Sequence, residues 1–378
     1  MKKNPFVTSV SLPEYFLWEK MEKAHNLISF DWDMTARCNF NCRHCYINLP
    51  MGDKEAKARE LSPDIFSRIA DKAVSLGALW CLLSGGEPLL RKDFSEIYMS
   101  LKKKGLLISI FTNASLITHD HIELFKKFPP RDIEVTVYGV TEDTFERVTR
   151  TQGAFKSFLK GVDLLLEGDI NVRFKAMALR SNLHEIPEIA RFCRERTKDK
   201  FRFDPFLHLR YDGNSFRNRE IRSERLTAED IVELEEADPE RFSELKKECR
   251  GVLSESRNQS ETSELFFCGA GMRSFSLSYD GIFRLCSSLW HPECLFDLKQ
   301  GNLSEAWNKV VASVRMMRSG RKEFLQRCAS CSLFNLCMWC PAHAYLESGK
   351  MDLPIEYFCD IAHKRVESGS KKLAKKKP

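Results

Sequence analysis

The sequence predicts an α/β protein in which a partial, TIM-like (β/α)6 barrel is followed by a small, cysteine-rich C-terminal domain. Strand-like and helix-like segments alternate from residue 27 to about residue 206, and this alternation is typical of a parallel sheet. Three cysteines follow the first predicted strand directly, at the edge where such barrels place functional groups. Cysteines become dense again between residues 266 and 360, which predicts a loop-rich domain held by metal.

The predicted strands are short apolar segments bounded by turn residues. The helix after the first strand shows the expected signals, because Ser62 stands at its N-cap, Pro63 at its first position and a glycine at its end. Right-handed crossovers would curl such a sheet into an open barrel. Strands are predicted at 27–34, 78–84, 106–113, 132–139, 170–178 and 200–206, with helices at 62–77, 92–105, 118–128, 142–148, 154–168 and 183–196.

The pattern divides the chain into five parts. Residues 207–265 are more polar than the barrel and predict a helical bridge. The last residues contain five lysines and no acid, which predicts a solvated, basic tail. The parts are an N-terminal segment (1–26), the barrel (27–206), the bridging segment (207–265), the cysteine-rich domain (266–365) and a disordered tail (366–378).

Composition and charge exclude several classes of protein. The chain has 378 residues, of which 43% are hydrophobic and 30% charged, as in ordinary globular proteins. No apolar stretch of about 18 residues occurs, so no membrane span is expected. The net charge is +6, and removal of the five tail lysines leaves +1, so nucleic-acid binding is not expected. The N-terminus lacks the features of a signal peptide, and the predicted location is the cytoplasm.

The cysteine content predicts metal binding, because a reducing cytosol disfavours structural disulfides. The chain has 14 cysteines, and three follow the first strand as Cys-x3-Cys-x2-Cys at Cys38, Cys42 and Cys45. Thiolates select iron–sulfur clusters, zinc or copper. A zinc site completed by His44 is one alternative. The spacing favours an iron–sulfur cluster that is one protein ligand short.

A second motif, LLSGGEPLL, follows the second predicted strand at residues 82–90. Gly85 and Gly86 at a strand end allow the backbone to approach a ligand closely. Glu87 adds a carboxylate, and Pro88 fixes the turn. Alone this motif is weak, but its place behind the cysteine triplet makes it a strong indication.

Together these motifs resemble the radical S-adenosylmethionine (radical SAM) superfamily over residues 27–206; Tyr46 after the triplet and TNASLIT at 112–118 add to the likeness. The resemblance implies that the triplet holds three irons of a [4Fe–4S] cluster, and that SAM chelates the fourth and is cleaved to a 5′-deoxyadenosyl radical. It implies cofactor contacts from Gly85, Gly86 and Glu87 near the methionyl amino group, from Asn113, Thr136 and Arg150 near the ribose or carboxylate, and from Tyr46 near the cluster or adenine.

The C-terminal cysteines resemble the SPASM extension of that superfamily over residues 266–360. On their own, the two Cys-x2-Cys pairs would favour a zinc ribbon. The resemblance instead implies two auxiliary [4Fe–4S] clusters, and so three in all. The chain departs from the family where only two residues separate the third and fourth cysteines of this run. The implied ligands are Cys328, Cys331, Cys337 and Cys359 for the outer cluster, and Cys268, Cys286 and Cys340 for the inner one.

The inner cluster is therefore one ligand short. Cys294, Asp297, water or the substrate are candidates for the vacancy, although Cys294 is interpreted as a free thiol. An open iron there would suit direct binding of a substrate thiolate.

The resemblance implies a radical SAM enzyme that modifies a peptide or protein, by forming a crosslink or thioether or by oxidising a residue. Alternatives are a small-molecule substrate such as a tetrapyrrole or sugar, a sulfatase-maturase-like oxidation, and a non-catalytic zinc or iron–sulfur protein. No acid directly follows Cys286, where sulfatase-activating relatives have their base, so no catalytic residue is assigned.

The expected partners follow from this chemistry. They are a peptide or protein substrate and an electron donor such as flavodoxin or ferredoxin. Only about 26 residues precede the first predicted strand, which is too few for a leader-binding domain. A separate leader-binding protein is therefore an expected partner for a leader-peptide substrate.

Overall fold

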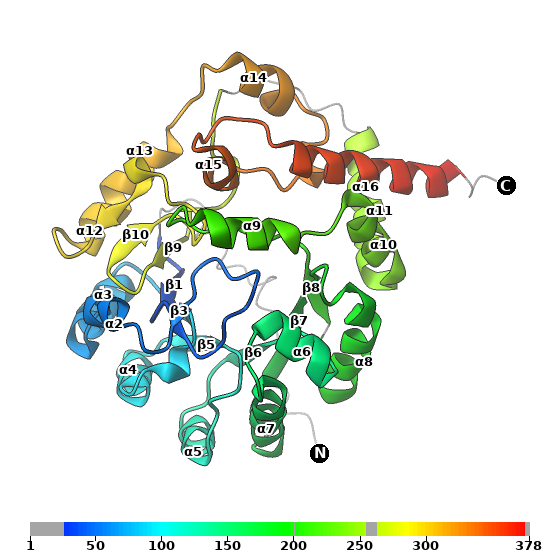
Figure 1. Ribbon diagram of the computed structural model, residues 1–378. Helices are drawn as coiled ribbons and strands as arrows, with labels where there is room; N and C mark the ends of the chain where they lie inside the picture. The colour runs from blue at the N-terminus through cyan, green and yellow to red at the C-terminus, as the bar shows by residue number, and fades with distance from the viewer. Residues whose placement is uncertain (1–25, 200, 255–262, 375–378) are drawn as a thin grey trace, which may run out of the picture.

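The computed structural model describes residues 26–199, 201–254 and 263–374. It has the expected α/β fold with a parallel sheet at its core (Figure 1). The predicted N-terminal segment lies outside the described residues, apart from its last position. Within the described parts, no helix has the length and apolar character needed to cross a membrane.

All six predicted strands form within their predicted bounds and run parallel in one sheet. Side chains alternate along them as the pleat requires. In β1, Phe30 and Trp32 face the helices, and the Trp32 ring lies 3.4 Å from that of Phe66. The strands are β1 (Ser29–Asp33), β4 (Trp80–Ser84), β5 (Leu107–Thr112), β6 (Asp132–Val137), β7 (Val172–Met177) and β8 (Arg202–Asp204).

Helices follow the strands and cover the outer face of the sheet, in an arc that Figure 1 shows from α3 to α8. Their apolar faces bury large side chains such as Phe66, Phe94, Phe125 and Phe158 against the strands. These helices are α3 (Pro63–Ser75), α4 (Phe94–Lys103), α5 (His119–Lys127), α6 (Glu142–Thr149), α7 (Ala154–Glu167) and α8 (Ile186–Arg196).

The cysteine-rich part contributes to the same sheet. Strand β9 (Ser274–Leu277) pairs parallel with β1, and β10 (Ile282–Arg284) and β11 (Phe296–Asp297) continue antiparallel beyond it. The sheet order is β11-β10-β9-β1-β4-β5-β6-β7-β8. The segment expected to be a separate domain therefore begins as an extension of the barrel sheet, and the domain boundaries stay predictions.

The remaining elements are mostly short. Residues 366–374, expected in a disordered tail, continue the last helix instead, and residues 375–378 lie outside the described part. These elements are β2 (Arg37–Cys38), β3 (Leu49–Pro50), α2 (Lys54–Arg59), α9 (Ser215–Ser223), α10 (Ala228–Ala237), α11 (Pro239–Ser254), α12 (Leu303–Glu305), α13 (Val311–Arg315), α14 (Lys322–Phe324), α15 (Pro341–Ser348), α16 (Glu356–Ala374) and single turns at η2 (Pro88–Leu90), η3 (Leu183–Glu185), η4 (Pro292–Cys294), η5 (Ala306–Val310), η6 (Leu325–Ala329) and η7 (Phe334–Leu336).

A buried ion pair joins the C-terminal strands to the barrel. Arg284 of β10 donates to the Asp33 carboxylate of β1 over 2.9 Å, and both side chains are almost fully buried. Burial raises the pKa of Asp33, and the Arg284 charge partly offsets that rise. The guanidinium also donates to the Ser287 carbonyl and lies over the Trp290 ring. The Arg284 guanidinium therefore stabilises the ionised form of the buried Asp33 carboxylate.

We expect Arg284→Met to lower the free energy of unfolding by about 3–5 kcal/mol, because it leaves the Asp33 carboxylate buried without its partner. Anaerobic urea unfolding measures this change. The double variant Arg284→Met/Asp33→Asn should recover part of the loss, since no buried charge remains. An equal loss in both variants would contradict the electrostatic explanation.

Candidate functional site: a cysteine-lined cavity at the edge of the barrel

The three N-terminal cysteines lie in the loop that connects β1 to α2. Strands β2 and β3 pair with each other and close this loop on itself. Backbone N–H groups point at two of the thiols, from Phe40 to Cys38 and from Asn48 to Cys45, each over 3.4 Å. Within the described residues, no three His, Cys, Asp or Glu side chains converge as the ligands of one metal ion do.

The electrostatics of these thiols favour a cationic group. Burial raises the pKa of Cys38 to about 12, with the Glu87 charge adding to the rise. Burial likewise raises the pKa of Cys42, and the other two thiols add to it. Thiolates at this site therefore need a positive group beside them, and iron ions supply that charge. The donor set fits an iron–sulfur cluster.

The double glycine packs against the cysteine loop itself. A Cβ atom on Gly85, which has φ +124°, would lie 2.3 Å from the Thr35 carbonyl oxygen. A Cβ on Gly86 would lie 2.2 Å from the Arg37 carbonyl oxygen. Gly86 N–H and Glu87 N–H donate to these same two carbonyls over 2.6 and 3.0 Å. The sequence predicted that the backbone of these glycines lies close to a ligand. In the structure it lies close to the backbone of the cysteine loop.

Glu87 lies behind the cavity and is fully buried. Its carboxylate accepts from the backbone N–H groups of Leu89 and Asn113 and from the Thr112 hydroxyl, over 2.8 to 3.0 Å. Burial raises its pKa to about 7, and these hydrogen bonds limit the rise. In this arrangement Glu87 joins the glycine turn to the end of β5, and its predicted contact with the cofactor stays a prediction.

Asn113 connects the end of β5 to the first cysteine. Its amide nitrogen donates to Asn39 Oδ1 over 3.0 Å and approaches Cys38 Sγ at 3.8 Å. The next residue, Ala114, has φ +62°, in the region that favours glycine. A residue with a Cβ atom adopts this conformation less readily than glycine does.

These groups surround a cavity of about 250 Å³. Eight predicted residues line it: Cys38, Cys42, Cys45, Tyr46, Gly85, Gly86, Asn113 and Thr136. Sequence reasoning missed other lining side chains at the same edge of the sheet. For those on the strands, the signal is the period of two, which turns alternate residues of each strand inward. The missed residues include Ser84, Phe111, Tyr138, Lys175, Met177, Asp204 and His208.

Arg150, predicted as a cofactor contact, does not line this cavity. It pairs with Glu220 of α9, and Glu220 also pairs with Arg217 over 2.9 Å. Arg217 donates to the Cys42 carbonyl over 2.8 Å, so helix α9 is held across the cysteine loop (Figure 1). The arrangement assigns Arg150 to anchoring α9, and a cofactor contact from it stays a prediction.

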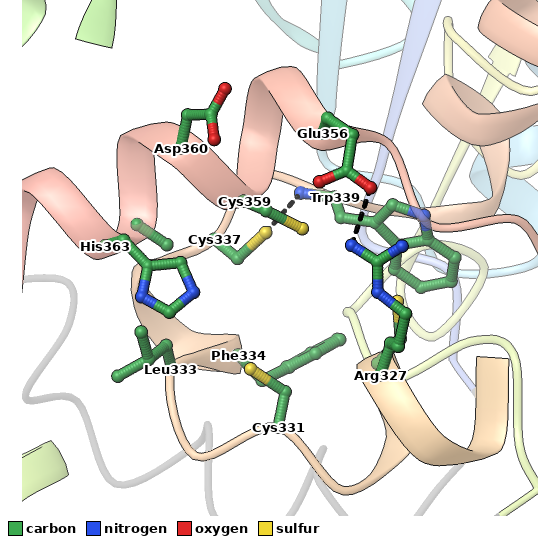
Figure 2. A pocket seen from close by; sticks show the side chains of 12 residues that line it. Arg327, Cys331, Leu333, Phe334, Cys337, Trp339, Glu356, Cys359, Asp360 and His363 are labelled. Atoms are coloured by element: carbon green, nitrogen blue, oxygen red, sulfur yellow. Dashed lines mark hydrogen bonds and ion pairs between the residues drawn. The ribbon is translucent and has the colours of Figure 1, made fainter. Parts of the chain in front are cut away.

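The four cysteines of the predicted outer cluster line one cavity of about 230 Å³. Figure 2 shows the sulfur atoms of Cys331, Cys337 and Cys359 facing the same space, with Cys359 on helix α16. Burial raises the pKa of Cys328, which also lines this cavity, to about 12, and the neighbouring thiols add to the rise. Trp339 N–H donates to Cys337 over 3.4 Å. This donor set also fits a cluster.

The predicted inner group is more open. Burial raises the pKa of Cys286 to about 11, and nearby Cys340 and Cys268 contribute to the rise, so the three thiols lie near one another. Cys268 is exposed. The group has no fourth thiol in its sequence motif.

Two candidates for the vacant ligand have other contacts. Cys294 is buried, and its thiol lies 3.9 Å from the sulfur atoms of both Met317 and Met351. The Asp297 carboxylate accepts from Lys299 N–H and from the Gln300 side chain within its own turn. Cys294 also lies near Cys286 of the inner group, whose charge adds to the rise that burial causes in the Cys294 pKa, so its interpretation as a free thiol stays a prediction.

A family model described as the radical SAM superfamily matches residues 32–193, which contain the cysteine triplet, the glycine turn and Asn113. The chain contains a radical SAM domain. A radical SAM domain implies SAM and an iron–sulfur cluster as cofactors, and the residues around the N-terminal cavity fit both. Glu87 and Arg150 are the two predicted cofactor contacts that lie outside this cavity.

Relatives of this radical SAM protein include SPASM enzymes and peptide maturases. It is 26% identical to the Fe-coproporphyrin III synthase of Methanosarcina barkeri, over 87% of this chain and 86% of the relative. It is 25% identical to the subtilosin biosynthesis protein AlbA of Bacillus subtilis, over 68% of this chain but only 54% of AlbA. The fold resembles Streptococcus suis SuiB bound to its precursor peptide SuiA, with a TM-score of 0.66, 16% identity and coverage of 93% and 82%.

We expect Gly86→Ala to displace the cysteine loop, because its new methyl group would meet a backbone carbonyl rather than a mobile side chain. The anaerobically reconstituted variant should lose about four irons per chain, the content of one [4Fe–4S] cluster. Gly52→Ala is the matched control, since no atom lies within 4 Å of the place that its Cβ would take. Full iron content in Gly86→Ala would show that the close approach is not needed.

A second iron measurement separates the C-terminal thiols. Cys331→Ala should remove about four irons, whereas Cys294→Ala should leave the iron content unchanged because its thiol faces two methionines. Loss of zinc instead of iron from Cys331→Ala would support the zinc-ribbon alternative. Loss of iron from Cys294→Ala would make that thiol a ligand.

Proposed function

We propose that the protein modifies a peptide or protein by removing a hydrogen atom with a 5′-deoxyadenosyl radical. The observation that supports this proposal most directly is that three cysteines, the glycine turn and Asn113 line one cavity. When bound there, SAM and a reduced [4Fe–4S] cluster supply the radical. Cys38, Cys42 and Cys45 would hold the cluster, with Gly85, Gly86, Asn113, Thr136 and Tyr46 around SAM.

The chain's own residues position the reaction and exclude water. Phe40, Phe111, Tyr138 and Phe206 give the cavity apolar walls, which protect a reactive carbon radical from side reactions. The cysteine loop is held in place by the hydrogen bond from Arg217 to the Cys42 carbonyl and by the pairing of β2 with β3. A fixed loop keeps the cofactor and substrate at a constant separation.

The C-terminal cysteines would hold two auxiliary [4Fe–4S] clusters, one on Cys328, Cys331, Cys337 and Cys359, and one on Cys268, Cys286 and Cys340. Their proposed role is to accept electrons from the substrate or to anchor it. A flavodoxin or ferredoxin would reduce the first cluster. A separate leader-binding protein would present the substrate if it carries a leader.

The charge of the cavity favours a peptide. Among the described lining residues Lys175 is the one lysine or arginine, and its ammonium pairs with Glu134 over 2.6 Å. A tetrapyrrole with several carboxylates would need more cations than this lining offers. SuiB, whose fold this chain shares, binds a precursor peptide.

A tetrapyrrole substrate is the second candidate, and one observation favours it. The match to the Fe-coproporphyrin III synthase spans most of both chains, whereas the match to AlbA spans about half of AlbA. The cation-poor lining argues against this substrate, so the peptide remains the first proposal.

The test is an anaerobic assay of the reconstituted enzyme with SAM and dithionite. One arm contains a pool of synthetic peptides rich in Cys, Ser, Tyr and Lys, and the other contains a coproporphyrin. We expect 5′-deoxyadenosine and a peptide that has lost two hydrogen masses, and neither product from Cys42→Ala. A modified coproporphyrin with unchanged peptides would replace the peptide proposal, and absence of 5′-deoxyadenosine would refute both.

A further inference from the structure

Two histidines from distant parts of the chain meet beside the N-terminal cavity. His208 follows β8, and His343 lies on α15. His208 Nδ1 is 3.0 Å from His343 Nε2 and 2.9 Å from the Ser288 hydroxyl. The two rings are edge to face, with centroids 4.5 Å apart. His208 lines the cavity, so this pair connects the cavity to the C-terminal part of the protein.

The hydrogen bonds determine which nitrogen of each ring carries a proton. His343 Nδ1 lies 3.2 Å from the Met338 carbonyl oxygen, which only accepts, so His343 Nδ1 is protonated. In a neutral ring its Nε2 is then an acceptor, and His208 Nδ1–H donates to it. His208 Nε2 is therefore left with a free lone pair.

The geometry leaves one nitrogen of His208 unused, because both hydrogen bonds that His208 makes among the described residues use Nδ1. The ring lines the cavity, and burial is the main cause that lowers the pKa of His208 to about 3, with His343 and Arg225 adding to the effect. The ring is therefore neutral, with its proton on Nδ1.

Asp204 and Tyr46 are polar side chains that line the same cavity. The Asp204 carboxylate lines the cavity but accepts from Phe206 N–H in its own turn over 2.9 Å. The Tyr46 ring lies 5.8 Å from that of His208, and burial raises the pKa of its hydroxyl. A protonated phenol is a poor base, whereas the hydrogen bonds of His208 leave the lone pair of its Nε2 free.

We propose that His208 Nε2 is the catalytic base that accepts a proton from the substrate; this inference rests on the proposed function. Removal of the hydrogen atom leaves a carbon radical, and a neighbouring N–H, O–H or S–H group then bonds to that carbon. Bond formation releases one proton and one electron. The proton goes to His208 Nε2, and the electron leaves for a one-electron acceptor of the iron–sulfur class.

The test separates base catalysis from packing. His208→Asn keeps an N–H donor near the Nδ1 position but has no group at Nε2. His343→Gln is the control, because its amide oxygen still accepts from His208 Nδ1–H. Both variants are assayed anaerobically with the pool peptide that the wild-type enzyme modifies, deuterated at its reacting carbon, after equal iron content is verified.

In His208→Asn we expect the ratio of modified peptide to 5′-deoxyadenosine to fall about a hundredfold, the usual contribution of a general base. Deuterium transfer into 5′-deoxyadenosine should stay near the wild-type level, since that step needs no base. His343→Gln should keep the wild-type ratio.

Two results would overturn the role of His208 alone. The first is an unchanged ratio in His208→Asn. The second is a parallel fall of modified peptide and deuterium transfer, which would indicate a packing or binding defect. If the wild-type enzyme forms 5′-deoxyadenosine but modifies no peptide of the pool, the proposed function fails and this inference fails with it.

Discussion

The site depends on one contact between two backbones. The turn at Gly85 and Gly86 lies so close to residues 35–37 that neither position has room for a side chain, and two hydrogen bonds join the segments. The turn extends from β4 and the cysteine loop from β1, so the contact fixes the loop to two adjacent strands of the sheet. Glu87 then joins the turn to the end of β5 through two hydrogen bonds, from the Thr112 hydroxyl and from Asn113 N–H. Three consecutive strands thereby determine where the thiols lie, and loops on a rigid sheet suit a reaction that needs precise positioning.

Burial of the thiols makes their ionisation costly unless a cation is bound beside them. At the N-terminal and outer C-terminal sites, burial and neighbouring thiols raise the pKa values of cysteines, so these sites are costly to ionise without a cation. The two cavities are separate, but the His208–His343 pair and the shared sheet connect the barrel to the cysteine-rich part. The buried pair of Arg284 with Asp33 strengthens the same connection.

Much of this was predictable from sequence because the signals are local. The strands follow from apolar runs with turn residues at their ends, and the cysteine groups follow from spacing. The roles of Arg150 and Glu87 were not predictable, because their partners are fixed by tertiary structure: Glu220 lies 70 residues from Arg150. His208 was missed for the same reason, since its partner His343 is 135 residues away. The extension of the barrel sheet by β9 was also missed, because a strand of four residues between cysteines has a weak pattern.

The central claim is that Cys38, Cys42 and Cys45 hold three irons of a cluster and that SAM binds directly to the fourth iron, which has no cysteine ligand. Electron–nuclear double resonance on the dithionite-reduced protein tests it most directly, with SAM labelled by ¹⁵N at its amino group. The account predicts a resolved ¹⁵N coupling to the reduced cluster, which disappears in Cys42→Ala while the C-terminal cysteines remain unchanged. A cluster that forms on these cysteines but shows no coupling to labelled SAM would contradict the account.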